Sequence, residues 1–172
     1  MELQIYKMWP DSPEIKYGTQ NSACFDLSAC LRDTVKCWYG NNQPVIHLTQ
    51  QDADGKRYIQ CPPGARMLIP TGLVFDIPQG HSVRVYARSG LSTKTGLCLA
   101  NSVGVIDSDY VEEVFVAIIN NSDQMVPLYH GDRIAQAELV LDTRVEPVYI
   151  LERPGRKTDR DGGFGSTGVS TR

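Results

Sequence analysis

The sequence predicts an all-β protein built as a sandwich or barrel. Short runs of alternating or β-branched residues recur along the chain with turn signals between them, and such spacing is typical of these folds. Proline in the turns presets φ, while glycine, asparagine and aspartate tolerate tight bends. Only one short segment, which begins at Ser89, has the pattern of a helix.

The predicted elements follow one another with short connections. In chain order the predicted strands are residues 3–6, 66–69, 73–77, 82–86, 114–119, 134–140 and 145–150. The clearest turns are residues 62–64, 70–72, 78–80, 120–123 and 130–132. The helix at Ser89 begins soon after the strand at 82–86. Residues 104–110 are predicted to form a hairpin between two strands, with Asp-Ser-Asp at its tip.

Length and charge restrict the organisation and the partners. The 172 residues fit one domain, because two ordinary domains need a longer chain. The formal net charge of -3 argues against general nucleic-acid binding, which requires a basic surface. No apolar run is long enough for a membrane span, and the N-terminus lacks a signal-peptide pattern. We therefore expect a soluble, intracellular protein of the cytoplasm.

The five cysteines do not have the spacing of a metal site. They lie at positions 24, 30, 37, 61 and 98, without two paired C-x-x-C units. We expect reduced, partly buried thiols.

Two stretches differ from the strand-rich remainder. Residues 33–61 contain a predicted hairpin, 44–48 against 57–60, that looks like a surface excursion from a domain spanning residues 1–152. Residues 153–172 are rich in proline, glycine and charge and have almost no apolar anchor. A segment of that composition buries too little surface to fold alone, so we expect a flexible C-terminal arm.

Two segments have the chemistry of phosphate binding. In Gly162 to Gly168, glycines allow close backbone approach while hydroxyls and amides can bind phosphate. The sequence Arg88-Ser89-Gly90 places a guanidinium and backbone amides where a strand gives way to a helix. Each segment also has a plain structural interpretation, as flexible chain or as a capped turn.

Two further segments allow a structural or a functional interpretation. Aspartates in a turn, such as Asp107 and Asp109, usually serve the turn itself. The segment from Gly131 is an ordinary turn into a strand unless Gln136 faces a ligand.

Taken together and in order, five motifs resemble those of the trimeric dUTPase family. They are Ala23-Cys24-Phe25-Asp26-Leu27, Arg88 to Leu91 with Lys94 and Gly96, Gly104 to Tyr110, Gly131 to Gln136, and Gly162 to Gly168. The resemblance covers residues 1–32 and 62–168. It implies a distorted β-barrel or jelly roll with 33–61 as an insertion, and a homotrimer whose active sites are shared between subunits.

The resemblance also implies an activity and its purpose. A member of the family is a dUTP pyrophosphatase, which hydrolyses dUTP to dUMP and pyrophosphate by water attack on the α-phosphorus. This reaction limits uracil incorporation into DNA and supplies dUMP for thymidylate synthesis. Mg²⁺ is the implied cofactor and dUTP the implied substrate.

Each matched residue inherits a role from the resemblance. Asp107 matches the general base that orients the attacking water, and Tyr110 matches the aromatic that packs against deoxyribose and excludes a 2′-hydroxyl. The uracil edge would be read by Asn101, Gly104, Val105 and Ile106. Residues that would bind the phosphates or close the site are Arg88, Ser89, Gly90, Gln136, Arg160, Phe164, Gly165, Ser166 and Thr167, with Phe164 stacked over uracil. Asp26 would contact Mg²⁺ indirectly, through water, since this ion keeps much of its hydration.

Three positions depart from the family pattern. Glu112 stands where the family usually has glycine, Arg160 matches the family arginine only across a one-residue deletion, and Cys24 replaces a frequent glycine.

Two alternative functions belong to different classes. A dCTP deaminase shares the fold but carries a glutamate ten residues after the aspartate that matches Asp107, where this chain has Ala117. A nucleotide-binding regulatory protein would act through residues 33–61 on a protein partner. The presence of Asp107, Arg88 and Gln136 favours the hydrolase.

Overall fold

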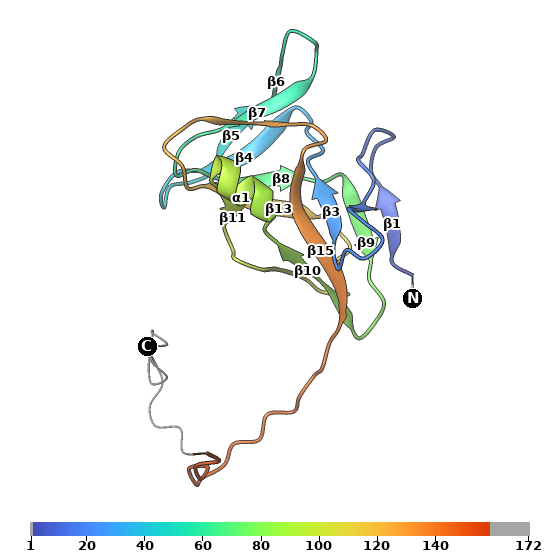
Figure 1. The fold of residues 1–172 in the computed structure, drawn as a ribbon, viewed down its shortest axis with the longest axis vertical. Coiled ribbons are helices and arrows are strands. Elements are labelled where there is room, and N and C mark those ends of the chain that lie inside the picture. The colour runs from blue at the N-terminus through green and yellow to red at the C-terminus, as the bar shows by residue number, and fades with distance from the viewer. Residues whose placement is uncertain (1, 159–172) are drawn as a thin grey trace.

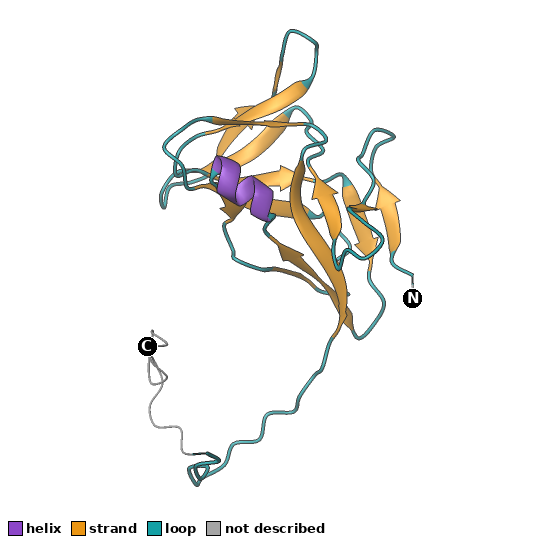
Figure 2. Ribbon diagram, in the orientation of Figure 1, coloured by secondary structure: helices purple, strands orange, loops and turns teal. Residues whose placement is uncertain are grey.

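The computed structural model describes residues 2–158, and strands account for nearly all of the regular structure in that range (Figure 2). In chain order the elements are β1 (Gln4–Lys7), β2 (Lys16–Tyr17), β3 (Phe25–Ser28), β4 (Thr34–Trp38), β5 (Val45–Leu48), β6 (Gln50–Gln51), β7 (Arg57–Cys61), β8 (Arg66–Pro70), β9 (Leu73–Asp76), β10 (His81–Tyr86), α1 (Ser89–Thr95), β11 (Leu97–Leu99), β12 (Gly104–Ile106), β13 (Phe115–Asn120), β14 (Val126–Tyr129) and β15 (Arg133–Leu141). The helix begins at Ser89, as predicted. Among the described residues, α1 is too short to cross a membrane.

The strands form two large and two small antiparallel sheets. One large sheet has the order β12-β10-β15-β3-β2 and the other β11-β13-β8-β4-β5. A two-stranded sheet, β1-β9, and a three-stranded sheet, β14-β7-β6, complete the arrangement. Neither large sheet closes on itself, so the all-β prediction is confirmed in the form of a distorted jelly roll.

Side chains that alternate along the strands build the core. Along β13, for example, Val116, Ile118 and Asn120 are buried while the residues between them are more exposed. Val83 of β10, Leu27 of β3 and Ile69 of β8 belong to the same buried cluster. The period of two in the sequence is therefore the period of burial, as expected for strands that pack one face inward.

The predicted strand at residues 145–150 is wrong. β15 ends at Leu141 and is the last strand among the described residues, after which the chain runs away from the sheets (Figure 1). Val145, Val148 and Tyr149 are 78%, 80% and 95% exposed. The alternating pattern is present, but a strand needs a hydrogen-bonded neighbour, and no strand of the described chain lies beside this segment.

The predicted pairing within residues 33–61 is also wrong. β5 pairs with β4, while β7 pairs with β14 and β6. The stretch is not only a surface excursion either, because β4 also pairs with β8 and buries Val35 and Cys37 in the core. The pairings of β4 with β8 and of β7 with β14 join this stretch to strands outside it.

The predicted hairpin at residues 104–110 divides between the two large sheets. β12 pairs with β10, with Val85 opposite Gly104, whereas β13 pairs with β11 and β8. The Asp-Ser-Asp turn therefore crosses from one sheet to the other. The predicted turn into a strand at residues 131–136 is confirmed: Gly131 has φ 85° and β15 begins at Arg133.

Candidate functional site

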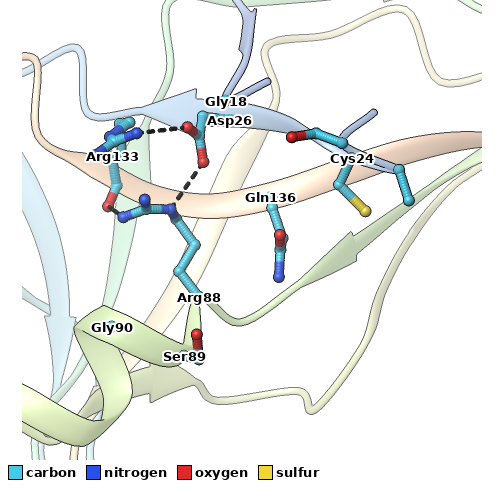
Figure 3. Close-up of a pocket in the computed structure, with 10 residues that line it drawn as sticks. Gly18, Cys24, Asp26, Arg88, Ser89, Gly90, Arg133 and Gln136 are labelled. Carbon is cyan, nitrogen blue, oxygen red and sulfur yellow. Dashed lines mark hydrogen bonds and ion pairs between the residues drawn. The ribbon is translucent and has the colours of Figure 1, made fainter. Parts of the chain in front are cut away.

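A basic pocket lies where the end of β10, the start of α1, β3 and β15 meet (Figure 3). It has a volume of about 510 Å³. Asp26, Arg88, Ser89, Gly90 and Gln136, all matched in sequence, line this pocket. The fold thus brings together residues from three separate motifs.

Two arginines bracket Asp26 at this pocket. Arg88 Nε donates to Oδ1 of Asp26 at 2.8 Å, and Arg133 Nη1 donates to Oδ2 at 3.0 Å (Figure 3). The Asp26 side chain is only 13% exposed. Two guanidiniums against one carboxylate leave a positive excess, which suits an anionic ligand.

Arg133 receives no role from the sequence motifs. Arg133 lies inside the fourth motif, at the start of β15. Its contact with Asp26 follows from the position of this residue opposite β3. That pairing is irregular, with a register shift between Arg133 and Ala135, so spacing alone could not have placed the guanidinium beside Asp26.

Gln136 holds the end of β10 in place. Its backbone lies opposite Tyr86 on one side and Asp26 on the other. The side-chain Nε2 donates to the backbone oxygen of Ala87 at 3.0 Å. Arg88, the next residue, has extended backbone geometry as the N-cap of α1, and no side chain caps the first turn of that helix.

A second pocket, with a volume of about 320 Å³, lies beside β12. Val105, Ile106, Asp107 and Tyr110, all from the third matched motif, line it. Three apolar residues missed by the sequence analysis complete the wall: Leu68, Val114 and Phe115. They come from β8, β13 and the residue before β13, which only the sheet arrangement brings close.

Close packing explains Gly104 and locates Asn101. A Cβ on Gly104 would lie 3.0 Å from Cβ of Val85 and 3.6 Å from Nδ2 of Asn101. Ser102, between the two motif residues, has φ 63°, a left-handed conformation that is uncommon outside glycine. The connection from Asn101 to β12 is therefore compact and closely fitted to β10.

Asp107 combines exposure with a fixed backbone. Its backbone oxygen accepts a hydrogen bond from the Tyr110 amide at 3.1 Å, which closes the turn. The side chain is exposed, and within residues 2–158 no hydrogen bond or ion pair engages its carboxylate. The turn is thus maintained by the backbone, and the carboxylate oxygens are available to a water or a ligand.

The two pockets have no lining residue in common. One is basic and the other mainly apolar, and each contains part of the matched set. Two matched residues, Asn101 and Gly104, line neither pocket. The other matched residues, Arg160, Phe164, Gly165, Ser166 and Thr167, lie outside the described residues. The predicted roles of all the matched residues stay predictions.

The donor set suits Mg²⁺ only through water. In residues 2–158 no three side chains of His, Cys, Asp or Glu come together in a way that could hold a metal ion. Asp26 is a single carboxylate with both oxygens engaged by arginines. Each oxygen retains a lone pair for a metal-bound water, so the site fits an outer-sphere contact.

Fold and pockets together define an anion-binding protein of the jelly-roll type. The dUTPase family model matches residues 52–168. A deoxyuridine 5'-triphosphate nucleotidohydrolase from Desulfotalea psychrophila is 38% identical over 177 aligned residues, which cover 98% of this chain and 100% of that protein. The chain belongs to the dUTPase family.

Solved structures share the fold. A mutant dUTPase of Staphylococcus bacteriophage 80alpha, with dUpNHpp, superposes with a TM-score of 0.72 at 19% identity, covering 98% of this chain and 99% of that one. A mutant dUTPase from phage phi11 of S. aureus, solved to show the coordination of a structural Mg(II) ion, has a TM-score of 0.66 at 18% identity and covers 90% and 100% of the two chains.

Proposed function

We propose that this protein is a dUTP pyrophosphatase, which hydrolyses dUTP to dUMP and pyrophosphate. Family membership and the similarity to the Desulfotalea nucleotidohydrolase support this activity. The observation that carries the proposal is the gathering of matched residues, dispersed from Asp26 to Gln136, into two pockets of complementary chemistry. One pocket suits a triphosphate, and the other suits a base and its sugar.

Asp107 is the general base of the proposed reaction. Its exposed carboxylate has oxygens free to take a proton from water, and a positioned base of this kind contributes about 10²–10⁴-fold. The attacked atom is the α-phosphorus. The products are then dUMP and pyrophosphate, so the enzyme limits uracil incorporation into DNA and supplies dUMP for thymidylate synthesis.

The basic pocket holds the phosphates. Arg88, Ser89, Gly90 and Gln136 contact them directly in this proposal, and Arg133 adds positive charge nearby. Phosphate oxygens compete with Asp26 for the Arg88 guanidinium, which offers five N–H donors in a planar fork. Residues Arg160, Phe164, Gly165, Ser166 and Thr167 of the arm complete the closed site.

Magnesium is the proposed cofactor. Asp26 would contact its water shell, and the phosphates of the substrate would supply its other ligands. When bound, Mg²⁺ neutralises phosphate charge and orients the chain of phosphates. The structure of the phi11 mutant dUTPase describes the coordination of a structural Mg(II) ion. It supports a role for this metal in the family.

The apolar pocket selects the nucleoside. Backbone groups of Gly104 to Ile106, with Asn101, read the uracil edge, and the Tyr110 ring packs against deoxyribose. Cytosine presents an amino donor where uracil presents an acceptor, and buried polar groups left unpaired can reject such an analogue by about 10⁴-fold. The connection from Asn101 to β12 is compact enough to support such close reading.

A homotrimer with shared sites accounts for the separation of the two pockets. The basic pocket of one subunit would face the apolar pocket of another. Exposed apolar residues around the second pocket, such as Val105, Val111 and Phe115, which are 52%, 64% and 45% exposed, are suited to burial against a second copy.

Product analysis with four nucleotides tests the proposed function. Purified protein with Mg²⁺ is given dUTP, dCTP, dTTP or UTP, and pyrophosphate and ammonia are measured. Pyrophosphate release from dUTP alone is expected. Ammonia from dCTP would indicate the deaminase, although the position of the deaminase glutamate is Ala117 in β13, opposite Leu68. Binding without turnover would indicate the regulatory protein.

A further inference from the structure

One side chain, Glu113, connects the loop that carries Tyr110 to the turn at Gly72 through a hydrogen bond. This loop runs from Asp107 to β13, and its two glutamates differ in setting. Glu112 is exposed, whereas Glu113 is half-buried, and burial raises the pKa of the Glu113 carboxyl above its usual range. A carboxylate removed from water needs a specific partner.

Glu113 accepts two hydrogen bonds, one on its side chain and one on its backbone. Its Oε1 accepts from the backbone N–H of Gly72 at 2.8 Å. Its backbone oxygen accepts from the hydroxyl of Tyr110 at 2.7 Å. The tyrosine hydroxyl is therefore tied to the same residue whose side chain is tied to Gly72, and the positive charge of Arg32 also favours the ionised carboxylate.

Gly72 is a rigid anchor. Its φ is +68°, and a Cβ there would lie 2.4 Å from Oγ of Ser12 and 2.7 Å from Sγ of Cys30. The neighbouring Thr71 is fully buried and donates through Oγ1 to the backbone oxygen of Val114 at 2.7 Å. Close packing against Ser12 and Cys30 restricts the position of the amide that Glu113 binds.

We propose that Glu113 is a positioning residue that sets the orientation of the Tyr110 ring and thereby the discrimination between deoxyribose and ribose. Tyr110 is 40% exposed and lines the apolar pocket, so little packing holds the ring on that side. The hydrogen bond to Glu113 supplies the restraint. This inference rests on the proposed function, in which Tyr110 excludes the 2′-hydroxyl.

Other hydrogen bonds hold the start of β13 in place without the bond between Glu113 and Gly72. The loop rejoins the sheet through Val114, whose amide donates to the backbone oxygen of Leu73 at 2.8 Å and whose oxygen accepts from the amide of Thr71 at 3.2 Å. Loss of the Glu113 carboxylate should therefore loosen the tyrosine loop while β13 stays in place.

The test measures kcat/KM for dUTP and for UTP in the full-length protein and in the variants E113A, E113Q and E112Q. E113A should lower the dUTP/UTP ratio about tenfold, the effect of losing one hydrogen bond to a charged group. E113Q retains an oxygen that accepts from Gly72 and should stay within about threefold of the parent. E112Q, at the exposed neighbour, should match the parent.

A second variant keeps the test decisive if E113A does not fold. Tyr110→Phe leaves the Glu113 carboxylate in place and removes the tethered hydroxyl, so it should lower the ratio as E113A does. In the double variant E113A/Y110F the dUTP/UTP ratio of kcat/KM should fall no further than in either single variant. Both substitutions break the same series of contacts from Gly72 to the Tyr110 ring. An unchanged ratio in Y110F, or fully additive losses, overturns the inference.

Failure of the inference is distinguishable from failure of the proposed function. A parent protein that does not hydrolyse dUTP, or that hydrolyses UTP equally well, contradicts the proposed function. A parent that discriminates, with an E113A variant that turns over dUTP and discriminates equally well, contradicts only the role of Glu113.

Discussion

Asp26 and Asp107 have different surroundings, which suit the different roles proposed for them. Asp26 is mostly buried between the guanidiniums of Arg88 and Arg133, at 2.8 and 3.0 Å. Its negative charge is therefore paired with the two arginines of the basic pocket. Asp107 is exposed and, in the described part of the chain, no side chain pairs with it. Of these two aspartates, only Asp107 therefore has both carboxylate oxygens available to a water or a ligand among the described residues.

Replacing Asp107 by asparagine should abolish most turnover without unfolding the protein. Asparagine is nearly isosteric and is favoured in turns, and the turn is held by the backbone bond from Tyr110 to Asp107. The single-turnover rate with dUTP should fall at least about a hundredfold, because an amide cannot accept the proton. Binding of a non-hydrolysable dUTP analogue, measured by calorimetry, should stay within about tenfold of the parent.

Asp109→Asn is the matched control, since Asp109 is exposed in the same turn. Its rate and its melting temperature should both resemble those of the parent. A near-normal rate in Asp107→Asn, or an equal loss in both variants, would remove Asp107 from the mechanism.

A separate cluster at Asp11 makes stability depend on pH. Hydrogen bonds from Arg32 and Arg57 lower the pKa of the Asp11 carboxyl from its usual 3.8 to about 2. A pKa that is depressed in the folded state means that the stabilisation is present above pH 4 and is lost as the pH falls from about 4 to about 2. The carboxylate is half-exposed, so the effect should also weaken in high salt.

Thermal unfolding of the parent and of Asp11→Asn from pH 7 to pH 2 measures this contribution. The parent should have the higher melting temperature at pH 7, and the difference should shrink as the pH approaches 2. A difference that is constant across this range would mean that Asp11 stabilises the fold by packing and not by charge.

At the scale of elements, residues 33–61 contain both core strands and an exposed edge. β4 is a member of the second large sheet and β7 buries Ile59 and Cys61. β5 is the outer strand of that sheet, with Ile46 and Leu48 at 54% and 71% exposure. An apolar edge strand of this kind is open to further pairing, as the alternative function with a protein partner at this stretch would require.

Deleting residues 41–56 and joining the ends by a short Gly-Ser link should spare catalysis. The deletion removes β5 and β6 but keeps β4 and β7, and no residue that lines either pocket falls in it. The melting temperature should fall, because β4 loses one of its two neighbouring strands, while kcat/KM for dUTP should stay within about threefold. A variant that assembles like the parent but does not hydrolyse dUTP would show that the stretch contributes to the site.

At the scale of the whole molecule, the described chain leaves apolar surface that its own strands do not cover. Residues 145–151 include Val145, Val148 and Leu151 at 78%, 80% and 106% exposure. They follow the last strand and run away from the sheets (Figure 1). In the proposed homotrimer, other subunits provide the missing cover.

Two truncations separate assembly from closure of the site. Ending the chain after Gly155 keeps the apolar stretch and should leave the trimer intact, but turnover should be mostly lost because the site stays open to water. Ending it after Asp142 removes the apolar stretch as well and should also weaken assembly.

Sedimentation analysis and dUTP turnover of both truncations check these outcomes. Near-normal activity after truncation at Gly155 would contradict the closing role of the arm. An unchanged trimer after truncation at Asp142 would show that the apolar stretch is not part of the interface.

The sequence by itself determined the all-β class, six of the strands and where most turns fall. Six predicted strands and the helix at Ser89 are present, because alternation and turn residues are local properties of a chain. Motif order was sufficient to place the chain among the dUTPases.

Only the tertiary structure decided how these pieces pair and which groups meet. The pattern at residues 145–150 was real, but no neighbour in the described chain makes it a strand. β12 joined β10 and not β13, β4 joined β8, and Arg133 came to face Asp26 across an irregular pairing. The physical reason is that pairing and burial depend on surfaces distant in sequence, whose complementarity exists only once the sheets have packed.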